Sequence, residues 1–142
     1  MYIVKKGIQK DYPRIRSFIE KSAAIYDESC QFIYVEGEKG ELLCVLGIQI
    51  LAGTAFLRSF VFSPAFPIHV LPSLFNDAMG LVEELGSDSI YLASNHKDSA
   101  AFFTSFDFEQ TDQENMPEAI KLSTAFMEFG RVEDVFFMCK TL

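Results

Sequence analysis

The stretch from Phe60 to Gly86, FVFSPAFPIHVLPSLFNDAMGLVEELG, has the residue pattern of a strand, a short loop and a helix. A junction of this kind can hold a phosphate group, because free backbone amides converge where the helix begins. Loops that do so are usually rich in glycine, which adopts the left-handed conformations they need. This loop has Pro67 and Pro72 and no glycine, and each proline removes one N–H donor. The stretch therefore predicts the geometry of a phosphate site with a reduced set of donors.

The residues before this stretch predict one helix and several strands. Asp11 is placed as the N-cap of a helix with Pro13 in its first turn and apolar residues at helical spacing. Two β-rich runs in residues 31–51 flank the sequence GEKG, which predicts a hairpin. Residues 53–62 predict a long strand, and residues 2–6 a short first strand.

The remaining residues predict an alternation of helices and strands. A helix from about Ser73 to Leu85 carries one apolar stripe, and Gly86 is placed to end it. Further elements are expected in this order: a strand at 89–94, a helix at 97–106, a strand from 106, a helix from Pro117 and a strand at 132–142. The order β α β β β α β α β (α) β predicts an α/β fold (α+β, with a mixed sheet) in which helices cover both faces of a central twisted sheet.

The composition predicts one domain that needs no metal or disulfide. The chain has 142 residues, 49% of them hydrophobic, with 15 phenylalanines, which is enough for a core of ordinary size. Cys30, Cys44 and Cys139 have no metal-ligand spacing and lie in apolar surroundings, so we expect buried free thiols.

The charge and the N-terminal sequence narrow the function classes. The net charge of −8 argues against nucleic acid as a partner, because such proteins need a basic face, and it leaves a cationic substrate open. The sequence has no apolar run long enough to cross a membrane. The N-terminal MYIVKKGIQK lacks the apolar stretch of a signal peptide. We therefore expect a cytoplasmic protein without a membrane partner.

The element order, with a β-hairpin before a strand–loop–helix, resembles that of the GNAT superfamily of acyl-CoA N-acyltransferases. FVFSPAF resembles the family's fourth strand, AFFTSFDFEQ its late phrase of aromatic-Tyr-x-x-x-Gly-Phe-Glu, and FFMCKTL its last strand. The likeness covers nearly the whole chain. It implies a single GNAT-like domain over residues 1–142, with acetyl-CoA as cofactor and a primary amine, small or peptidic, as acceptor.

The pyrophosphate loop of the resembled family is altered in this chain. The family places Arg or Gln, two residues, Gly, one residue, then Gly or Ala, whereas the sequence offers Pro67, Val70 and Pro72 there. If two hydrogen bonds to a charged group are lost at about 1.5–3 kcal/mol each, affinity falls by roughly two to four decades. His69 can supply one donor in compensation. We expect weak or lost cofactor binding unless other contacts compensate.

The resemblance also implies particular contacts between the chain and the cofactor. The fourth strand would present backbone groups to the thioester, the loop would face the pyrophosphate, and the fifth strand would open the sheet for the pantetheine arm. The implied cofactor-binding residues are Phe60, Val61, Phe62, Ile68, His69, Val70, Asn95 and Phe103.

The expected acid and base are harder to find. Phe103 stands where the family often has the tyrosine that protonates the leaving thiolate, and Asp107 stands where it has glycine. The fourth strand holds no carboxylate, and Arg58 is its only charge. The remaining candidates for proton transfer are Tyr34, Glu36 and Tyr91. Each also has a structural interpretation: the tyrosines suit strands, and Glu36 lies beside a turn.

Two functions remain open at this level. The first is an N-acetyltransferase, active or formerly active, with a divergent cofactor loop. The second is a non-catalytic GNAT-fold module that acts through protein contacts, because fold does not determine function. Residues 117–130 carry Ile120, Phe126, Met127 and Phe129 in a stretch that need not be apolar, which suggests a homodimer contact or a lid.

Overall fold

The structure, a computed structural model, describes residues 2–22, 24–94, 97–123, 126–127 and 135–142. By the density of internal contacts the chain divides into two compact units, and each is described by itself. The first unit comprises Met1–Gln49 and Arg58–Leu81. The second unit comprises Ile50–Leu57 and Val82–Leu142.

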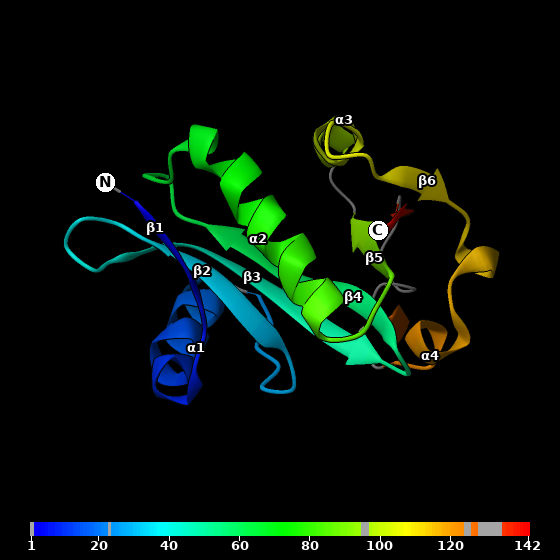
Figure 1. Cartoon of the computed structure of the whole chain (residues 1–142), viewed down its shortest axis with the longest axis horizontal. Coiled ribbons are helices and arrows are strands. Elements are labelled where there is room, and N and C mark those ends of the chain that lie inside the picture. Colours follow the sequence, from blue (N-terminus) through cyan, green and yellow to red (C-terminus); the bar gives the residue numbers. More distant parts are fainter. Residues whose placement is uncertain (1, 23, 95–96, 124–125, 128–134) are drawn as a thin grey trace. The chain divides into compact units, whose positions relative to one another are not determined.

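The element order is the predicted one (Figure 1). The strands are β1 (Ile3–Lys6), β2 (Gln31–Glu36), β3 (Leu42–Leu51), β4 (Thr54–Phe62), β5 (Ser89–Ser94), β6 (Glu109–Thr111) and β7 (Phe136–Thr141). The α-helices are α1 (Tyr12–Lys21), α2 (Leu71–Glu84), α3 (Lys97–Thr104) and α4 (Glu118–Lys121). Short 3₁₀ helices are η1 (Gln9–Asp11), η2 (Ile68–Val70) and η3 (Gln113–Asn115).

The strands form one sheet of mixed direction, in the order β1-β2-β3-β4-β5-β7-β6. β2 pairs antiparallel with β1 and β3, and β7 pairs antiparallel with β5 and β6. β4 and β5 pair in parallel. The prediction of a mixed central sheet in an α/β fold is confirmed.

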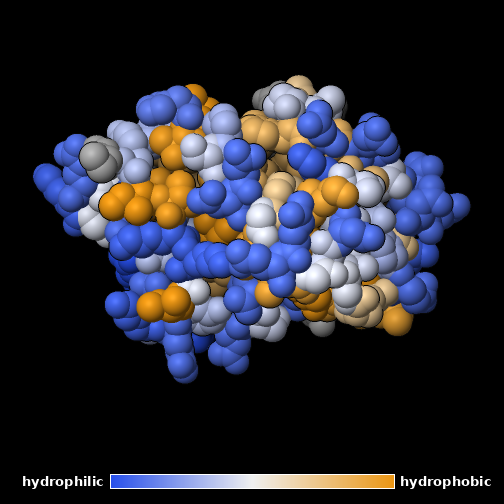
Figure 2. Space-filling model, in the orientation of Figure 1, coloured by the Kyte–Doolittle hydropathy of each residue, from blue (hydrophilic) through white to orange (hydrophobic). Residues whose placement is uncertain are grey.

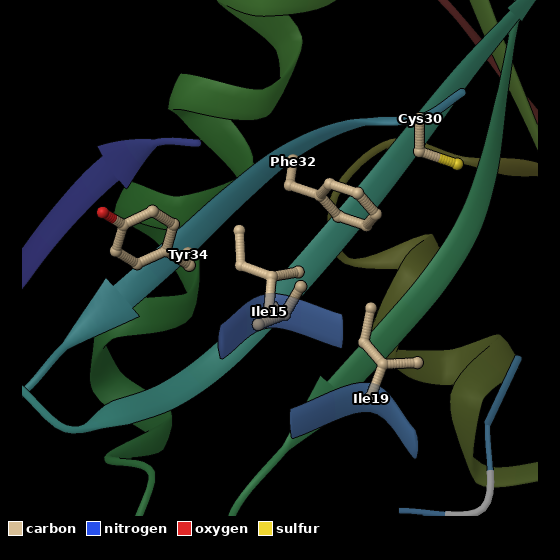
Figure 3. Packing of buried hydrophobic residues seen from close by; sticks show 6 residues of the cluster. Ile15, Ile19, Cys30, Phe32 and Tyr34 are labelled. Atoms are coloured by element: carbon tan, nitrogen blue, oxygen red, sulfur yellow. The ribbon is translucent and has the colours of Figure 1, made fainter. Parts of the chain in front are cut away.

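The core of the first unit forms between β2 and α1. Cys30, Phe32 and Tyr34 alternate along the chain and point at Ile15 and Ile19 of α1 (Figure 3). This alternation follows from the two-residue repeat of a strand, which sends every second side chain to the same face.

The opposite face of β2 is also covered. Residues 32–35 of β2 are all buried, which requires packing on both faces of the strand. In Figures 1 and 3, α2 lies across the strands on the side away from α1. Helices therefore cover both faces, as predicted.

Two local predictions are refined by the structure. Asp11 is the N-cap of α1, but its side chain reaches back to accept a hydrogen bond from the amide of Ile8, at 3.1 Å, in place of capping the helix. α2 begins at Leu71, two residues earlier than expected, because η2 runs directly into it. Gly86 follows α2 with a φ of 85°, the left-handed conformation that ends a helix.

The second unit has a core of its own, which includes part of the segment predicted as a dimer contact. Ile120 and Phe126 are buried together with Phe56, Met116 and Phe137. Met127 is exposed, and Phe129 lies outside the described residues. The apolar character of residues 117–130 is therefore explained in part by the core, and the homodimer contact stays a prediction.

Candidate functional site

The junction between β4 and α2 lies in the first unit, and few of its backbone amides lack a hydrogen-bond acceptor. The amide of Phe66 donates to the carbonyl of Ser63, and the amide of Val70 donates to the carbonyl of Pro67, both at 3.0 Å. Pro67 and Pro72 have no N–H. The amides of Ile68 and His69 have no backbone acceptor within the part of the chain that the structure describes. Two adjacent donors at the start of η2 therefore remain for an anion.

Aromatic and aliphatic side chains surround this junction. The rings of Phe60 and Phe62 lie 5.6 Å apart, and that of Phe62 lies 6.0 Å from Phe66. Phe62 and Ile68 are more than half exposed. Figure 2 shows hydrophobic side chains gathered where Figure 1 places the chain between β4 and α2, beside β1. The junction thus combines few polar donors with an exposed apolar surface, and Val61 lies half-buried between the two phenylalanines.

Within the second unit, β4 and β5 pair in parallel through Ala55 with Ile90 and Phe56 with Tyr91. From Leu92 to Ser94, β5 pairs with β7.

Tyr34 and Glu36 are brought together by an arginine that the sequence analysis did not single out. Nη2 of Arg14, on α1, donates to the Tyr34 hydroxyl at 3.2 Å and to Oε2 of Glu36 at 2.5 Å. Glu36 also forms an ion pair with Lys5 at 2.9 Å. These contacts place the two candidate residues in one polar network on the α1 face of the first unit.

The electrostatics of this network do not favour proton transfer by Glu36. The hydrogen bond from Arg14, with that from Lys5, lowers the pKa of Glu36 below its usual value. A lowered pKa stabilises the ionised form and makes the carboxylate a weaker base. Burial raises the pKa of Tyr34, which is 2% exposed. The geometry assigns both residues structural contacts, and their catalytic role stays a prediction.

Tyr91 lies in the second unit, where it pairs with Phe56 of β4. Its side chain is half-buried beside the core that contains Phe56 and Phe137. Burial raises its pKa, so the hydroxyl keeps its proton over a wider pH range. In the pairing of β5 with β7, Tyr91 lies opposite Cys139. A protonated, half-buried hydroxyl is able to serve as a proton donor.

The last two predicted cofactor residues differ in what the structure says of them. Phe103, on α3, is buried, with its ring 5.4 Å from that of Phe108. This is the environment of a core residue, and a cofactor contact for Phe103 stays a prediction. Asn95 lies outside the described residues.

A second polar network was missed from the sequence. Nη1 of Arg58 donates to Oδ2 of Asp27 at 2.9 Å and to Oε1 of Gln49 at 3.1 Å. The Arg58 side chain is only 10% exposed. A lone arginine in the apolar strand TAFLRSFVF signals a need for an acidic partner, because a buried charge is costly unless it is paired. That signal does not say which acid supplies the partner.

The cysteine thiols and the possible metal ligands offer little reactivity among the described residues. Burial raises the pKa of Cys30 and of Cys44 to about 12, so both thiols stay protonated and unreactive. Cys139 is half-buried, and all three are free. Among the described residues, no cluster of three or more His, Cys, Asp or Glu side chains is placed to hold a metal ion. The helices that the structure describes include none long and apolar enough to span a membrane.

Comparison with known proteins adds relatives in sequence and in structure. No protein-family model matches the chain. An uncharacterised protein of Bacillus subtilis strain 168, YwlB, is 27% identical over 144 residues, which cover 98% of this chain and 97% of the relative.

The similar solved structures include several acetyltransferases. A GNAT-family acetyltransferase of Staphylococcus aureus Mu50 superposes with a TM-score of 0.73 at 14% identity, covering 100% of this chain and 99% of that one. The chain has the GNAT fold. The ribosomal-protein-S18-alanine N-acetyltransferase of Escherichia coli gives a TM-score of 0.68 at 15% identity, over 99% and 94% of the two chains.

One GNAT-fold neighbour was solved with coenzyme A. N-acetylglutamate synthase of Neisseria gonorrhoeae, complexed with coenzyme A and N-acetyl-glutamate, has a TM-score of 0.77 at 14% identity. The alignment covers 100% of this chain but 35% of the synthase, so the chain spans about a third of that neighbour's length. The resemblance stated from the sequence is confirmed at the level of fold.

Proposed function

We propose that this chain is an acyl-CoA-dependent N-acyltransferase with a divergent cofactor loop, which transfers an acetyl group to a primary amine. The observation that carries the proposal is the GNAT fold, which the chain shares over its full length with a solved acetyltransferase. Solved neighbours bound to coenzyme A support an acyl-CoA cofactor.

The residues present fit acetyl-CoA in part. The amides of Ile68 and His69 are the donors available to the pyrophosphate, and the His69 side chain adds one more. The amide of Val70 is already used. Phe60, Val61 and Phe62 present main-chain groups of β4 toward the thioester in this proposal. When bound, the cofactor supplies the acyl group as an activated thioester.

Among the three predicted proton-transfer residues, Tyr91 suits catalysis best. Its hydroxyl carries a proton that the leaving thiolate can take, which is the task of a general acid. Tyr34 and Glu36 are held by Arg14 in contacts that stabilise the fold. Positioning of the amine and the backbone donors of β4 contribute the remaining rate acceleration.

Cofactor binding is tested by thermal shift and calorimetry with acetyl-CoA and coenzyme A. At a hundredfold excess over Kd, binding stabilises the folded state by about 2.7 kcal/mol. Release of free thiol is then followed with a panel of primary amines. Absence of any stabilisation at millimolar cofactor, together with absence of thiol release, would overturn the proposal and favour the non-catalytic module that acts through protein contacts.

A single substitution tests whether the loop is the phosphate site. Pro72 lies in the first turn of α2, and Pro72→Ala restores an N–H there. We expect tighter binding of coenzyme A, by about ten- to a hundredfold, because one hydrogen bond to a charged group is gained. Pro13→Ala is the matched control, since Pro13 occupies the first turn of α1. Equal affinities in both variants would show that the loop does not hold the phosphate.

The remaining expectations belong to the same proposal. We infer a cytoplasmic enzyme that acts as one domain over residues 1–142 and takes a small-molecule or peptide amine, without nucleic acid as a partner. A homodimer through residues 117–130 is tested by sedimentation of Met127→Ser, since Met127 is exposed whereas Phe126 is buried. An unchanged mass would count against that contact.

A further inference from the structure

A groove on the first unit has no role in the proposed cofactor site. It has a volume of about 540 Å³ and is lined by Gln9, Tyr12, Glu28 and Ser29. Gln9 and Tyr12 lie where α1 begins, and Glu28 and Ser29 lie in the segment that leads from α1 to β2. Gln9, Glu28 and Ser29 are exposed, and Tyr12 is half-buried. The four side chains are thus accessible to a small ligand.

The hydroxyl groups of Tyr12 and Ser29 each donate their proton to an acceptor within the protein. The Tyr12 hydroxyl donates to the carbonyl of Cys30 at 3.1 Å. Oγ of Ser29 donates to Oδ1 of Asp27 at 2.6 Å and accepts from Nε2 of Gln49 at 2.9 Å. A hydroxyl has one proton and two lone pairs. Toward a ligand, both groups therefore act as hydrogen-bond acceptors.

Glu28 adds a negative charge to these acceptors. An ionised carboxylate only accepts hydrogen bonds. Within the described ranges Glu28 forms no ion pair. Two arginines near the segment are engaged elsewhere: Arg58 with Asp27, and Arg16 with Glu20 at 3.1 Å. The carboxylate of Glu28 is therefore available to a cation.

The aromatic ring of Tyr12 is held in a defined orientation. It stands edge-on to the ring of Phe32, with centroids 5.6 Å apart, while Tyr26 stacks on Phe32 at 5.7 Å. The adjacent Asp27 is fixed by the amide and hydroxyl of Ser29 and by Arg58. An aromatic ring next to a carboxylate suits a cation, because the ring face carries negative potential.

From these contacts we infer that the groove binds a protonated primary amine, with Glu28 supplying the charge and Tyr12 and Ser29 accepting its N–H groups. An ammonium group has three donors and no acceptor, which matches the acceptor oxygens of Glu28, Tyr12 and Ser29, whereas the amide of Gln9 can donate or accept. A neutral alcohol lacks the positive charge that Glu28 attracts, and Glu28 repels a carboxylate. If the proposed function holds, this ligand is the acceptor amine. That identification rests on the proposed function, whereas the binding of an ammonium ion by the groove does not.

The test is an NMR titration of the full chain, labelled with ¹⁵N and free of acyl-CoA. The probes are n-butylammonium, n-butanol and butyrate, which share a chain length and differ in the charge of the head group. We expect amide shifts at Tyr12, Glu28 and Ser29 that saturate with the ammonium ion. Equal responses to the alcohol, or no response to the ammonium ion, would overturn the inference.

Two variants with the same change in charge sharpen the test. In Glu28→Gln the affinity for n-butylammonium should fall by about 1.5- to 5-fold, as expected for loss of an exposed ion pair. Glu83→Gln, at an exposed position of α2, should bind like the unmodified chain. An unchanged affinity in Glu28→Gln would overturn the assigned role of Glu28.

The outcome separates this inference from the proposed function. Because the titration contains no cofactor, loss of ammonium binding leaves acyl-CoA binding untouched. Failure to bind acyl-CoA likewise leaves the groove in place. If transfer is observed, Glu28→Gln should raise the KM for the amine and leave kcat nearly unchanged, since Glu28 binds the amine and moves no proton.

Discussion

Strands β2 and β5 each carry a tyrosine that the sequence marks as a candidate for proton transfer, and the two tyrosines differ in their surroundings. Tyr34 of β2 is almost fully buried, and its hydroxyl accepts from Arg14. Tyr91 of β5 is half-buried, with Phe56 of β4 as its partner on one side and Cys139 of β7 on the other. A polar side chain that is fully buried with its partners stabilises the fold, whereas a half-buried one remains accessible to a ligand.

The comparison is tested most strongly by Tyr91→Phe. We expect kcat for acetyl transfer to fall by about 10² or more, since a general acid contributes a factor of that size. The KM for acetyl-CoA should change little, because the hydroxyl acts on the leaving group. Steady-state measurement of thiol release gives both constants.

Tyr34→Phe is the matched control for that experiment. It removes the same hydroxyl group from the other strand, and kcat should stay within about twofold of the unmodified chain. A drop in kcat of similar size in both variants would abolish the distinction between the two strands. A drop in kcat in Tyr34→Phe alone would assign the proton transfer to Tyr34 in place of Tyr91.

The effect of Tyr34→Phe should appear in stability. Removing the hydroxyl from Arg14 should lower the free energy of unfolding by about 1 kcal/mol, the typical contribution of one hydrogen bond. Urea denaturation measures this change. Tyr2→Phe, at an exposed position near the N-terminus, is the control and should leave the midpoint unchanged. A stability equal to that of the unmodified chain would show that the Arg14 contact is not formed in solution.

The smallest expected effect concerns Glu36 and pH. Its pKa is lower in the folded chain than the ordinary 4.5, because of the hydrogen bonds from Arg14 and Lys5. The unfolded chain therefore binds more protons in acid, so the contribution of Glu36 is complete above about pH 5 and is lost as the pH falls through the lowered pKa. Glu36→Gln should reduce stability at pH 7 by at most about 1 kcal/mol.

This difference between Glu36→Gln and the unmodified chain should shrink between pH 5 and pH 3, as measured by urea denaturation. Glu83→Gln removes a carboxylate from an exposed position of α2 and controls for the change in net charge. A constant difference across the pH range would indicate that the ion pairs of Glu36 do not contribute to stability.

Much of the fold could be predicted because its signals are local. The alternation in residues 31–51 and the apolar stripe before Gly86 indicated the β2–β3 hairpin and α2. α2 begins two residues before the predicted start, because the 3₁₀ helix η2 runs directly into it. The residues of η2 are too few to show a helical repeat in the sequence. Element type follows from contacts within a few residues, and boundaries depend on neighbours that the local pattern omits.

The candidate site could be predicted only in part. The prolines of the loop were visible in the sequence, and so was the unusual Arg58 in an apolar strand. The partners of Tyr34 and Glu36 were not, because Arg14 lies 20 and 22 residues away from them along the chain. Polar pairing over such separations depends on how a helix packs on a strand.

By itself the sequence determined the order of the elements, the absence of glycine from the loop between β4 and α2, and the acidic charge. Only the tertiary structure decided that Tyr91 pairs with Phe56, that Arg14 engages Tyr34 and Glu36, and that Glu28 and Tyr12 line one groove. The physical reason is range: periodicity and turn chemistry act over a few residues, whereas strand register and ion pairs join segments that folding brings together.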